Sequence, residues 1–534
     1  MRTVRSPQLF LLGLFLLAGL IAFSPNLNSY FLSDDFVQIG KVLHGDYSVA
    51  WGQEHGGFFR PLFIWSYFID SHLWGVRSFG YHLTNVLVHA LNSFLVFRLA
   101  AGLLENIESR KKRIVSITAG ALFLLHPSHS EAVIWISGRA DLLATLFLLL
   151  SLLTYLAYED RKRELYLATS LAFFAIALLA KESAICTPFL VLVIGLCRRA
   201  KLARLVRAFA MFAAVTLLFI LVRARFIGSV IGGYGNAQHL NFAPGWLRDR
   251  LLEAVVRSIL PPLPSAWLTF LFKPLQSSVF YLLVLFIAAA TATAIVIRRR
   301  SYQPAERKNQ NRFMFMLAAL FLMSLLPVLN LRLSLYQTQG ERFVYLPTVF
   351  ACLLIGYVGT LVIRRTTVCL IALTALVGFY SWSLYRTNLL WREAATLSAR
   401  LSYDVTDTAS KAPLVVLNAP DNLRGVPVFH NGLAEAMNWQ RPKDSVKRVQ
   451  IVAFQDLQSA TDETLINEND LVGVRAVNPA DRFSRVTATD CLEVMSAAQD
   501  AFDLHPKPCA STAEIVFFSG GTIKELKTSL PNRN

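Results

Sequence analysis

The sequence predicts an all-α polytopic membrane protein of about eleven membrane helices, followed by a small C-terminal α/β domain on the extracytoplasmic side. Three observations support this fold class. The 534 residues are 54% hydrophobic and only 16% charged, whereas soluble proteins carry about 25% charged residues. Apolar runs alternate with short basic loops up to residue 386. Beyond it the sequence becomes polar and contains short strand-like runs.

The apolar runs predict the membrane helices, because most are about long enough to enter a bilayer. The first run follows Arg2 and Arg5, and no small-residue cleavage site comes after it, which is typical of an uncleaved signal-anchor. We expect helices near residues 8–24, 82–104, 114–126, 140–158, 165–180, 183–197, 207–223, 279–297, 313–329, 343–363 and 367–385.

The charged loops predict the orientation, because positively charged loops between membrane helices stay in the cytoplasm. Such loops lie at residues 110–113, 161–163, 198–207, 298–312 and 364–365. The N-terminus falls on the same side. The outer side then holds loops 25–80, 127–139, 224–278 and 330–342 and the whole tail. We expect a multi-pass protein of the bacterial inner membrane with a periplasmic C-terminal domain.

The formal net charge of +17 does not indicate nucleic-acid binding, because of where the charge lies. Residues 1–399 carry 38 basic and 18 acidic side chains, a net charge of +20. Residues 400–534 carry 14 basic and 17 acidic side chains, a net charge of −3. Most of the excess sits in short loops, where it sets the membrane orientation. The expected partners therefore include membrane lipids and exclude nucleic acid.

The tail, residues 387–534, predicts a second domain after a membrane domain of residues 1–386. Strand-like runs at 414–417, 450–454, 471–474 and 515–518 and a helical stretch at 429–439 indicate an α/β fold. Cys491 and Cys509 are its only cysteines, and they predict a disulfide if the tail faces an oxidising compartment.

Two outer segments predict short helices at the membrane surface. Loop 25–80 is rich in Phe, Trp and Tyr, whose rings partition to the membrane interface. The stretch 246–259 has the amphipathic pattern of an interfacial helix.

Two adjacent carboxylates, Asp34 and Asp35, follow the first membrane helix directly. Placing charged groups at the edge of hydrocarbon is costly, so a protein that keeps them there usually uses them for a proton, a cation or a developing charge. The alternative is structural, since Asp34 could cap a short helix that starts near Phe36.

Other polar side chains gather on the outer side. The turn after Pro127 brings His126, His129, Glu131, Arg139 and Asp141 into one segment, which predicts contact with a sugar or phosphate. A plain ion pair between Arg139 and Asp141 is the alternative.

Two further outer segments carry charge. Lys181 and Glu182 lie between two apolar runs and could simply pair with each other. Arg342 stands beside Glu341 and Tyr345 at the end of a predicted helix, where a guanidinium suits a lipid-linked phosphate. Snorkelling of Arg342 to the interface is the alternative.

One face of the helix from Tyr81 is polar. His82, Asn85, His89 and Asn92 recur at three- and four-residue spacing, so they share a face. Such a stripe favours interhelical hydrogen bonds over a metal site.

Six motifs together resemble one family. They are Ser33-Asp34-Asp35, Phe59-Arg60-Pro61-Leu62, Tyr81 to Ala90, His126 to Asp141, Lys181-Glu182 and Glu341 to Pro347. In this order they resemble the membrane part of the transmembrane and tetratricopeptide-repeat O-mannosyltransferases and their bacterial relatives, in the GT-C class of glycosyltransferases. The resemblance covers about residues 5–365. The α/β tail stands where the eukaryotic members have helical repeats.

The resemblance implies an inverting mannosyltransferase-like reaction, in which a sugar passes from a polyprenyl-phosphate carrier to a hydroxyl of a glycan, lipid or protein acceptor at the outer face. A carboxylate must take the acceptor proton, and positive charge must stabilise the departing phosphate. Asp34 and Asp35 are the candidate bases, the first favoured. The candidate donor-binding residues are Arg342, Arg60, Lys181 and Tyr345. The candidate pocket residues are His126, His129, Glu131, Arg139, Asp141, Glu182 and Glu341.

The acid pair could also hold a divalent cation, which is the one cofactor that the sequence suggests.

Two alternatives come from other functional classes. A lipid or glycolipid transporter or flippase would also carry charge within the membrane. However, the charges here gather on one face, and the repeated halves of many transporters are not evident. A membrane-anchored scaffold acting through its tail is the third interpretation.

Overall fold

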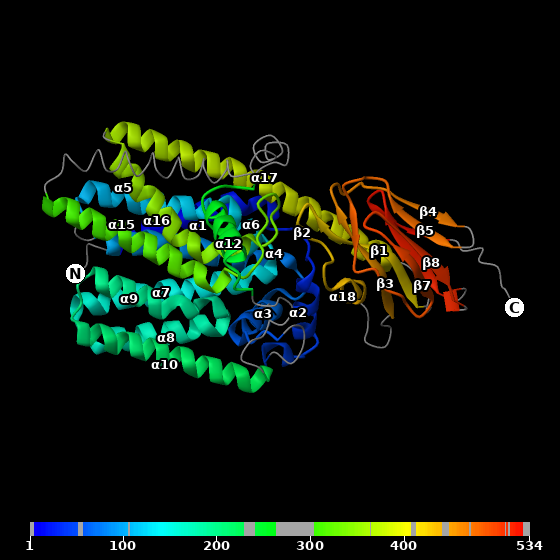
Figure 1. The fold of residues 1–534 in the computed structure, drawn as a ribbon, viewed down its shortest axis with the longest axis horizontal. Coiled ribbons are helices and arrows are strands. Elements are labelled where there is room, and N and C mark those ends of the chain that lie inside the picture. The colour runs from blue at the N-terminus through cyan, green and yellow to red at the C-terminus, as the bar shows by residue number, and fades with distance from the viewer. Residues whose placement is uncertain are drawn as a thin grey trace.

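The structure is a computed structural model that describes residues 5–51, 57–104, 107–228, 241–262, 304–363, 365–406, 413–439, 448–468, 471–507, 509–510 and 513–526. A bundle of long helices forms one end of the molecule, and a domain of β-sheets forms the other (Figure 1). The mostly helical fold with a small C-terminal sheet domain is the predicted fold class.

Within the described residues, the bundle contains ten helices at predicted membrane positions. They are α1 (Arg5–Phe23), α4 (Ser78–Leu103), α5 (Ser109–Leu124), α7 (Arg139–Arg161), α8 (Glu164–Ala180), α9 (Thr187–Cys197), α10 (Leu202–Ile227), α15 (Pro304–Leu325), α16 (Tyr345–Val362) and α17 (Thr366–Thr406). The helix expected at 279–297 lies outside the described residues.

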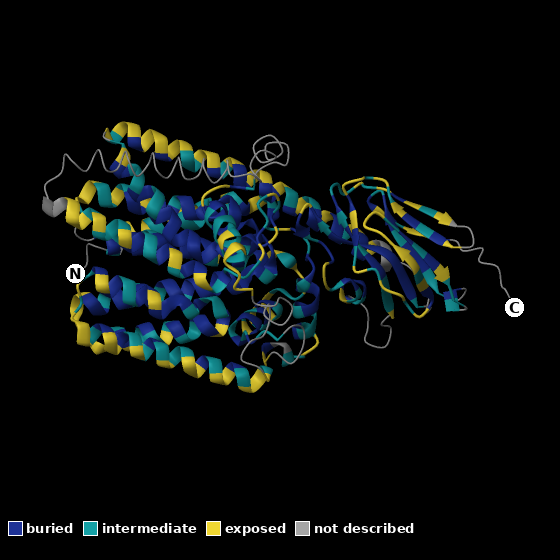
Figure 2. Cartoon of the chain, viewed as in Figure 1, coloured by how far each residue is buried: buried dark blue, intermediate teal, exposed yellow. Residues whose placement is uncertain are grey.

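Among the described residues, seven helical segments are long and apolar enough to cross a membrane. Residues 164–180 and 182–197 form shorter apolar helices. Buried residues lie in the interior of the bundle, and exposed residues lie along its outer helices (Figure 2). On α10, Leu217, Leu218 and Leu221 are exposed. An exposed apolar surface of this kind suits contact with lipid.

Short helices cover the end of the bundle nearest the sheets, and three of them, α2, η2 and α3, form in the aromatic-rich loop 25–80, where short helices are predicted. They are α2 (Asp34–Leu43), η2 (Ser48–Trp51), α3 (Pro61–Trp74), η3 (Pro127–His129), α6 (Ser130–Ile134), η4 (Ile136–Gly138), η5 (Glu182–Cys186) and η7 (Glu341–Val344). The predicted amphipathic helix is α12 (Pro244–Arg257).

The sheet domain contains two sheets. The first has the order β10-β9-β1-β3-β6, with β1 parallel to β3 and β9, and the second is antiparallel with the order β4-β5-β8-β7. Buried residues of both sheets, such as Val415 and Val474, belong to one hydrophobic cluster. The strands are β1 (Leu414–Leu423), β2 (Val426–Pro427), β3 (Val449–Leu457), β4 (Thr464–Glu468), β5 (Val472–Ala476), β6 (Arg482–Ser484), β7 (Leu492–Ala497), β8 (Ala501–Pro506), β9 (Glu514–Ser519) and β10 (Thr522–Glu525).

Two details of the tail differ from the sequence expectation. Helix α18 (Leu433–Asn438) is shorter than the predicted 429–439, because Gly432 has a φ of 83° and residues before it leave the helical conformation. Helix α17 runs through the predicted boundary at residue 386 and continues to Thr406. Cys491 and Cys509 form a disulfide, the pairing that the sequence predicts.

Candidate functional site

The acid pair lies where the sheet domain meets the bundle. Helix α2 begins at Asp34 itself, so the expected helix start near Phe36 is wrong, and Asp34 is not its cap. Ser33, the residue before it, has a φ of 49°, which is uncommon for a residue other than glycine. Its backbone N–H donates to the carbonyl of Val428 at 2.9 Å, and its hydroxyl accepts from the N–H of Asn431 at 3.1 Å. The sheet domain therefore holds the backbone next to the acids.

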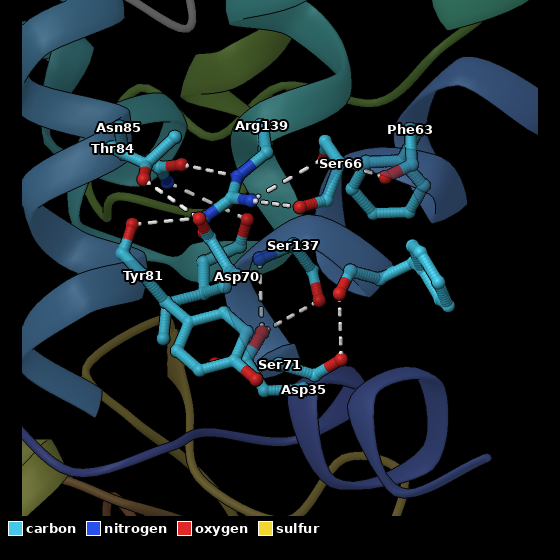
Figure 3. Close-up of polar contacts among 12 residues, drawn as sticks. Asp35, Phe63, Ser66, Asp70, Ser71, Tyr81, Thr84, Asn85, Ser137 and Arg139 are labelled. Atoms are coloured by element: carbon cyan, nitrogen blue, oxygen red, sulfur yellow. Dashed lines mark hydrogen bonds and ion pairs between the residues drawn. The ribbon is translucent and has the colours of Figure 1, made fainter. Parts of the chain in front are cut away.

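Asp35 is buried, and both of its carboxylate oxygens are occupied. Oδ2 accepts the N–H of Leu32 at 3.0 Å, while Oδ1 accepts the N–H and the hydroxyl of Ser137 at 2.9 and 2.6 Å. Figure 3 shows Asp35 pointing at Ser137. Burial raises the pKa of Asp35 to about 7, although these hydrogen bonds oppose the rise. Asp35 thus ties the start of α2 to the segment before α7.

Asp34 has different surroundings. It is partly exposed, and its Oδ1 accepts a hydrogen bond from the side-chain amide of Asn431 at 2.7 Å. The two adjacent carboxylates are therefore not equivalent: one is enclosed in the bundle, and the other is accessible beside the sheet domain.

The sheet domain makes close contact with this segment. A Cβ atom built on Gly432 would lie 2.6 Å from the carbonyl oxygen of Ser33. The ring of Trp439 packs against Phe31 and Phe36, with centroids 5.1 and 5.4 Å apart. Only glycine fits at position 432, because it needs both the positive φ and the close approach.

Replacing Gly432 with Ala is expected to lower the free energy of unfolding by about 2–4 kcal/mol, because it adds overpacking to an unfavourable φ. Gly520→Ala is the matched control. Gly520 also has a positive φ, but nothing lies within 4 Å of its Cβ position. Thermal unfolding of both purified variants measures the difference. Equal losses would show that Gly432 does not seat the domain.

Among the residues that the structure describes, three ion pairs are buried on both sides. They are Arg139–Asp70 at 2.7 Å, Lys181–Asp141 at 2.6 Å, and Arg257–Glu341. Each joins separate elements, so the alternative pairings of Arg139 with Asp141 and of Lys181 with Glu182 are wrong. Buried pairs of this kind fix geometry, since neither charge can stay in a dry interior alone.

Arg139 illustrates how completely such a charge is enclosed. Its guanidinium donates to the side chain of Asn85 at 2.7 Å and to the carbonyl of Tyr81 at 2.9 Å, beside its ion pair with Asp70 (Figure 3). It also lies 4.9 Å from the centroid of the Tyr67 ring. Contact with a substrate is not open to it in this arrangement.

Two further pairs are less buried. Arg60 holds Glu182 in bidentate fashion at 2.5 and 3.0 Å. Arg342 pairs with Glu131, whose other oxygen accepts the Arg342 backbone N–H at 2.8 Å. The side chains of Arg60 and Arg342 are 12% and 17% exposed. The three predicted phosphate-binding cations, Arg60, Lys181 and Arg342, therefore each have a carboxylate partner. Of these, Arg60 and Arg342 are also partly exposed at the surface.

Arg342 lies close to the acid pair through one aromatic residue. Its guanidinium stacks on the ring of Trp135 at 4.6 Å. The indole N–H of Trp135 donates to the carbonyl of Leu32 at 3.2 Å, next to Ser33 and the acids. Arg342 is thus held by Glu131 and Trp135.

The predicted histidines are buried and hydrogen-bonded. His126 accepts from the N–H of Ser128 at 3.2 Å and contacts the carbonyl of Ser258 at 3.1 Å. His129 Nε2 lies 2.7 Å from the hydroxyl of Thr348. Both histidines are therefore interior residues of the bundle, with hydrogen-bond partners within the protein.

Tyr345 is also buried. Its hydroxyl lies 2.7 Å from His89 Nδ1 and 3.2 Å from the amide of Asn92, so the geometry does not place it on a donor phosphate. His89 and Asn92 also contact the carbonyls of Leu124 in α5 and Leu142 in α7, at 3.0 and 2.9 Å, which confirms the interhelical role of the polar stripe. His82 and Asn85 contact the carbonyls of Ser29 and Val133. Within the described ranges, no three His, Cys, Asp or Glu side chains are placed to hold a metal ion.

A polar pocket of about 470 Å³ lies beside Asn431, between loop 330–342 and the sheet domain. His430 and Asp421 face each other in it at 3.0 Å. The hydrogen bond to Asp421 raises the pKa of His430. Burial and the neighbouring Asp421 raise the pKa of Asp456 to about 6. The pocket's other lining residues are Gln337, Gln339, Asn422, Gln458, Ala480, Arg482, Ser484 and Arg485.

Sequence reasoning missed Asp70, Arg257 and Asn431. Asp70 is a lone acid in the apolar stretch that forms α3, a signal of the kind that marked other sites. Arg257 lies on the amphipathic helix, where a basic residue is ordinary. Asn431 lies in the tail, and nothing in its local sequence points to Asp34.

Comparisons with known proteins give partial matches. The chain is 34% identical to Protein O-mannosyl-transferase Tmtc1 of Drosophila melanogaster over 165 residues, which are 30% of this chain and 18% of that protein. It is 38% identical to Drosophila melanogaster Tmtc2 over 136 residues, 24% of this chain and 14% of that protein. It is 31% identical to human TMTC4 over 167 residues, 28% of this chain and 22% of that protein. The predicted resemblance to this family is confirmed, over less than a quarter of each relative's length.

No family model matches the chain. Among solved structures, it resembles ArnT from Cupriavidus metallidurans bound to undecaprenyl phosphate, with 12% identity, a TM-score of 0.43, and coverage of 92% of this chain and 97% of that one. The apo state of the same protein gives a TM-score of 0.45, with 12% identity and coverage of 83% and 92%.

Proposed function

We propose that this chain is a GT-C glycosyltransferase that moves a sugar from a polyprenyl-phosphate carrier to an acceptor hydroxyl, at the membrane face that carries the sheet domain. The observation that carries the proposal is the inequivalence of the two acids, with a partly exposed Asp34 on the same short segment as a fully enclosed Asp35. The partial similarity to protein O-mannosyltransferases supports the same class of reaction and makes mannose the first sugar to test.

The proposed reaction is a single displacement. The acceptor hydroxyl gives its proton to Asp34 while its oxygen attacks the anomeric carbon of the sugar. The bond from that carbon to the phosphate oxygen breaks on the opposite side, so the configuration inverts. The bonding electrons leave with the lipid phosphate, whose added negative charge Arg342 and Arg60 stabilise.

Asp35 is a positioning residue in this proposal. Its Oδ2 holds the backbone N–H of Leu32, just before the acid pair, and its Oδ1 holds that of Ser137 in η4. These bonds fix the start of α2 and with it the direction of Asp34. The proposal assigns no divalent cation to the acid pair, because the oxygens of Asp35 already accept from N–H and O–H donors. In this proposal the polar pocket beside Asn431 binds the acceptor and selects whether it is a glycan, a lipid or a protein.

We further propose the bacterial inner membrane, with a cytoplasmic N-terminus and a periplasmic sheet domain. The basic loops at one end of the bundle support this orientation. The Cys491–Cys509 disulfide does too, since disulfides persist in oxidising compartments.

Arg342→Lys is expected to raise the donor KM by about tenfold, and Arg342→Ala by about a hundredfold, because Lys keeps the charge but loses the planar fork. Purified protein, a polyprenyl-phosphate-linked mannose and an acceptor measure this. Arg424→Lys, in an exposed ion pair with Glu393, is the control and leaves the KM unchanged. An unchanged KM in Arg342→Ala would remove Arg342 from the donor site.

The rival function, lipid transport, is separated by the same assay. A transferase forms product in detergent, where no membrane divides two compartments. Transport without product in vesicles, together with no transfer in detergent, would overturn the proposed function.

A further inference from the structure

A second cavity, of about 600 Å³, opens at the end of the bundle opposite the sheet domain. It lies where the ends of α4, α7, α9, α15 and α16 meet the turn between α9 and α10. In Figure 1 this end of the bundle lies on the left, away from α2, the helix that begins with the acid pair. The proposed reaction does not use it.

The rim of this cavity is basic. Seven Lys or Arg and three Asp or Glu side chains line it, a net charge of 7 − 3 = +4. The three acids all have basic partners: Glu159 contacts Lys162 and Arg204, Asp160 contacts Arg198, and Glu108 contacts Lys111.

Three basic residues remain. Arg199, Lys201 and Arg312 have no ion-pair partner within the part of the chain that the structure describes. They approach the cavity from two elements, the α9–α10 turn and α15. An anion between them would gain from all three charges at once.

Arg199 also occupies a backbone position that suits glycine. Its φ is 57°, where the turn closes with hydrogen bonds from Arg199 N–H to the Leu196 carbonyl at 3.1 Å and from Ala200 N–H to the Gly195 carbonyl at 2.9 Å. A residue with a side chain is disfavoured there. An arginine kept in an unfavourable conformation at the rim of a cavity points to a use for its side chain.

The floor of the cavity is apolar. Leu103, Phe313 and Tyr357 line it, and the rings of Phe313 and Tyr357 lie 4.6 Å apart. A basic rim over an apolar floor, between membrane helices, matches the two parts of a phospholipid. Membrane orientation alone requires basic residues somewhere in these loops, but not around an apolar cavity.

We propose that this cavity binds an anionic glycerophospholipid, with the phosphate between Arg199, Lys201 and Arg312 and the upper acyl chain against Phe313 and Tyr357. The binding is independent of sugar transfer. A soluble phosphate compound would use the rim alone and leave the apolar floor empty.

The test uses the purified full-length chain, delipidated in detergent, with lipid retention measured by native mass spectrometry. Phosphatidylglycerol is expected to bind with one site, and phosphatidylcholine is not. The triple variant Arg199→Gln/Lys201→Gln/Arg312→Gln is expected to bind phosphatidylglycerol on the order of a hundredfold more weakly, since each basic group near a lipid surface contributes about 1 kcal/mol.

The matched control is Arg110→Gln/Arg113→Gln/Arg163→Gln, which removes the same charge from exposed residues that do not line the cavity. It is expected to keep the affinity of the unaltered protein. The variant Arg199→Lys/Lys201→Arg/Arg312→Lys keeps the charge and is expected to keep binding, which shows that loss in the first variant is not unfolding.

Three results would overturn the proposal. One is an equal loss in the cavity variant and its control, which indicates diffuse attraction. Another is equal binding of phosphatidylcholine. The third is displacement of phosphatidylglycerol by glycerol phosphate at similar concentration, which identifies a soluble anion as the ligand.

Discussion

Replacing Asp34 with Asn is expected to slow sugar transfer by roughly a hundredfold to ten-thousandfold, the usual contribution of a general base. The amide has the same shape, and its oxygen can still accept the hydrogen bond from Asn431. It cannot take a proton from an acceptor hydroxyl at neutral pH. The thermal unfolding temperature of Asp34→Asn should therefore equal that of the unaltered protein, while kcat falls.

Asp35→Asn is the matched comparison, and it is expected to fail in a different way. Both oxygens of Asp35 accept backbone N–H groups, from Leu32 and Ser137. An amide must turn its NH2 group toward one of them, which leaves a buried donor unpaired and costs about 1–3 kcal/mol of stability. Transfer measured on the folded fraction should fall less than in Asp34→Asn.

These two variants separate the possible outcomes. Near-normal turnover in Asp34→Asn would return Asp34 to a structural role. Loss of turnover in Asp35→Asn alone, with unchanged stability, would reverse the two assignments.

Replacing Asp70 with Asn is expected to lower the free energy of unfolding by about 3–5 kcal/mol, because Arg139 would keep its charge in a dry interior without a counter-ion. The Arg139 side chain is 0% exposed and that of Asp70 is 4% exposed. Thermal or denaturant unfolding in detergent measures the loss.

Glu393→Gln provides the control for this effect. It breaks the Arg424–Glu393 pair, whose side chains are 44% and 40% exposed, and exposed pairs contribute at most about 1 kcal/mol. A loss in Asp70→Asn as small as in Glu393→Gln would mean that Arg139 finds other partners, such as the carbonyl of Tyr81.

The helices could be predicted from the sequence because their signal is local. An apolar run such as Leu9–Phe23 by itself predicts a helix in lipid. The three- and four-residue spacing of His82, Asn85, His89 and Asn92 by itself predicts that they share one helix face. Strands such as β7 gave no comparable signal, because most of its residues are exposed or half-buried without alternation.

The pairing of charges could not be predicted in the same way. Glu131 and Arg342 lie 211 residues apart, and Asp34 and Asn431 lie 397 residues apart. A sequence shows that each charge is costly in its surroundings, but the partner that offsets the cost is set by how the helices pack. The adjacent partners weighed for Arg139 and Lys181 were wrong for this reason.

Helix α17 is a single continuous helix that connects the membrane bundle to the sheet domain and sets the distance between them. Its 41 residues form a rod of about 60 Å, roughly twice the thickness of the hydrocarbon core. Near its far end it holds the sheet domain through Glu393 and Arg424 and through Arg400 and the carbonyl of Gly521. Because a helix transmits rotation as well as length, each residue added within it would raise the domain by about 1.5 Å and swing it by about 100°. The length of this one helix therefore sets both the distance and the direction of Asn431 from Asp34.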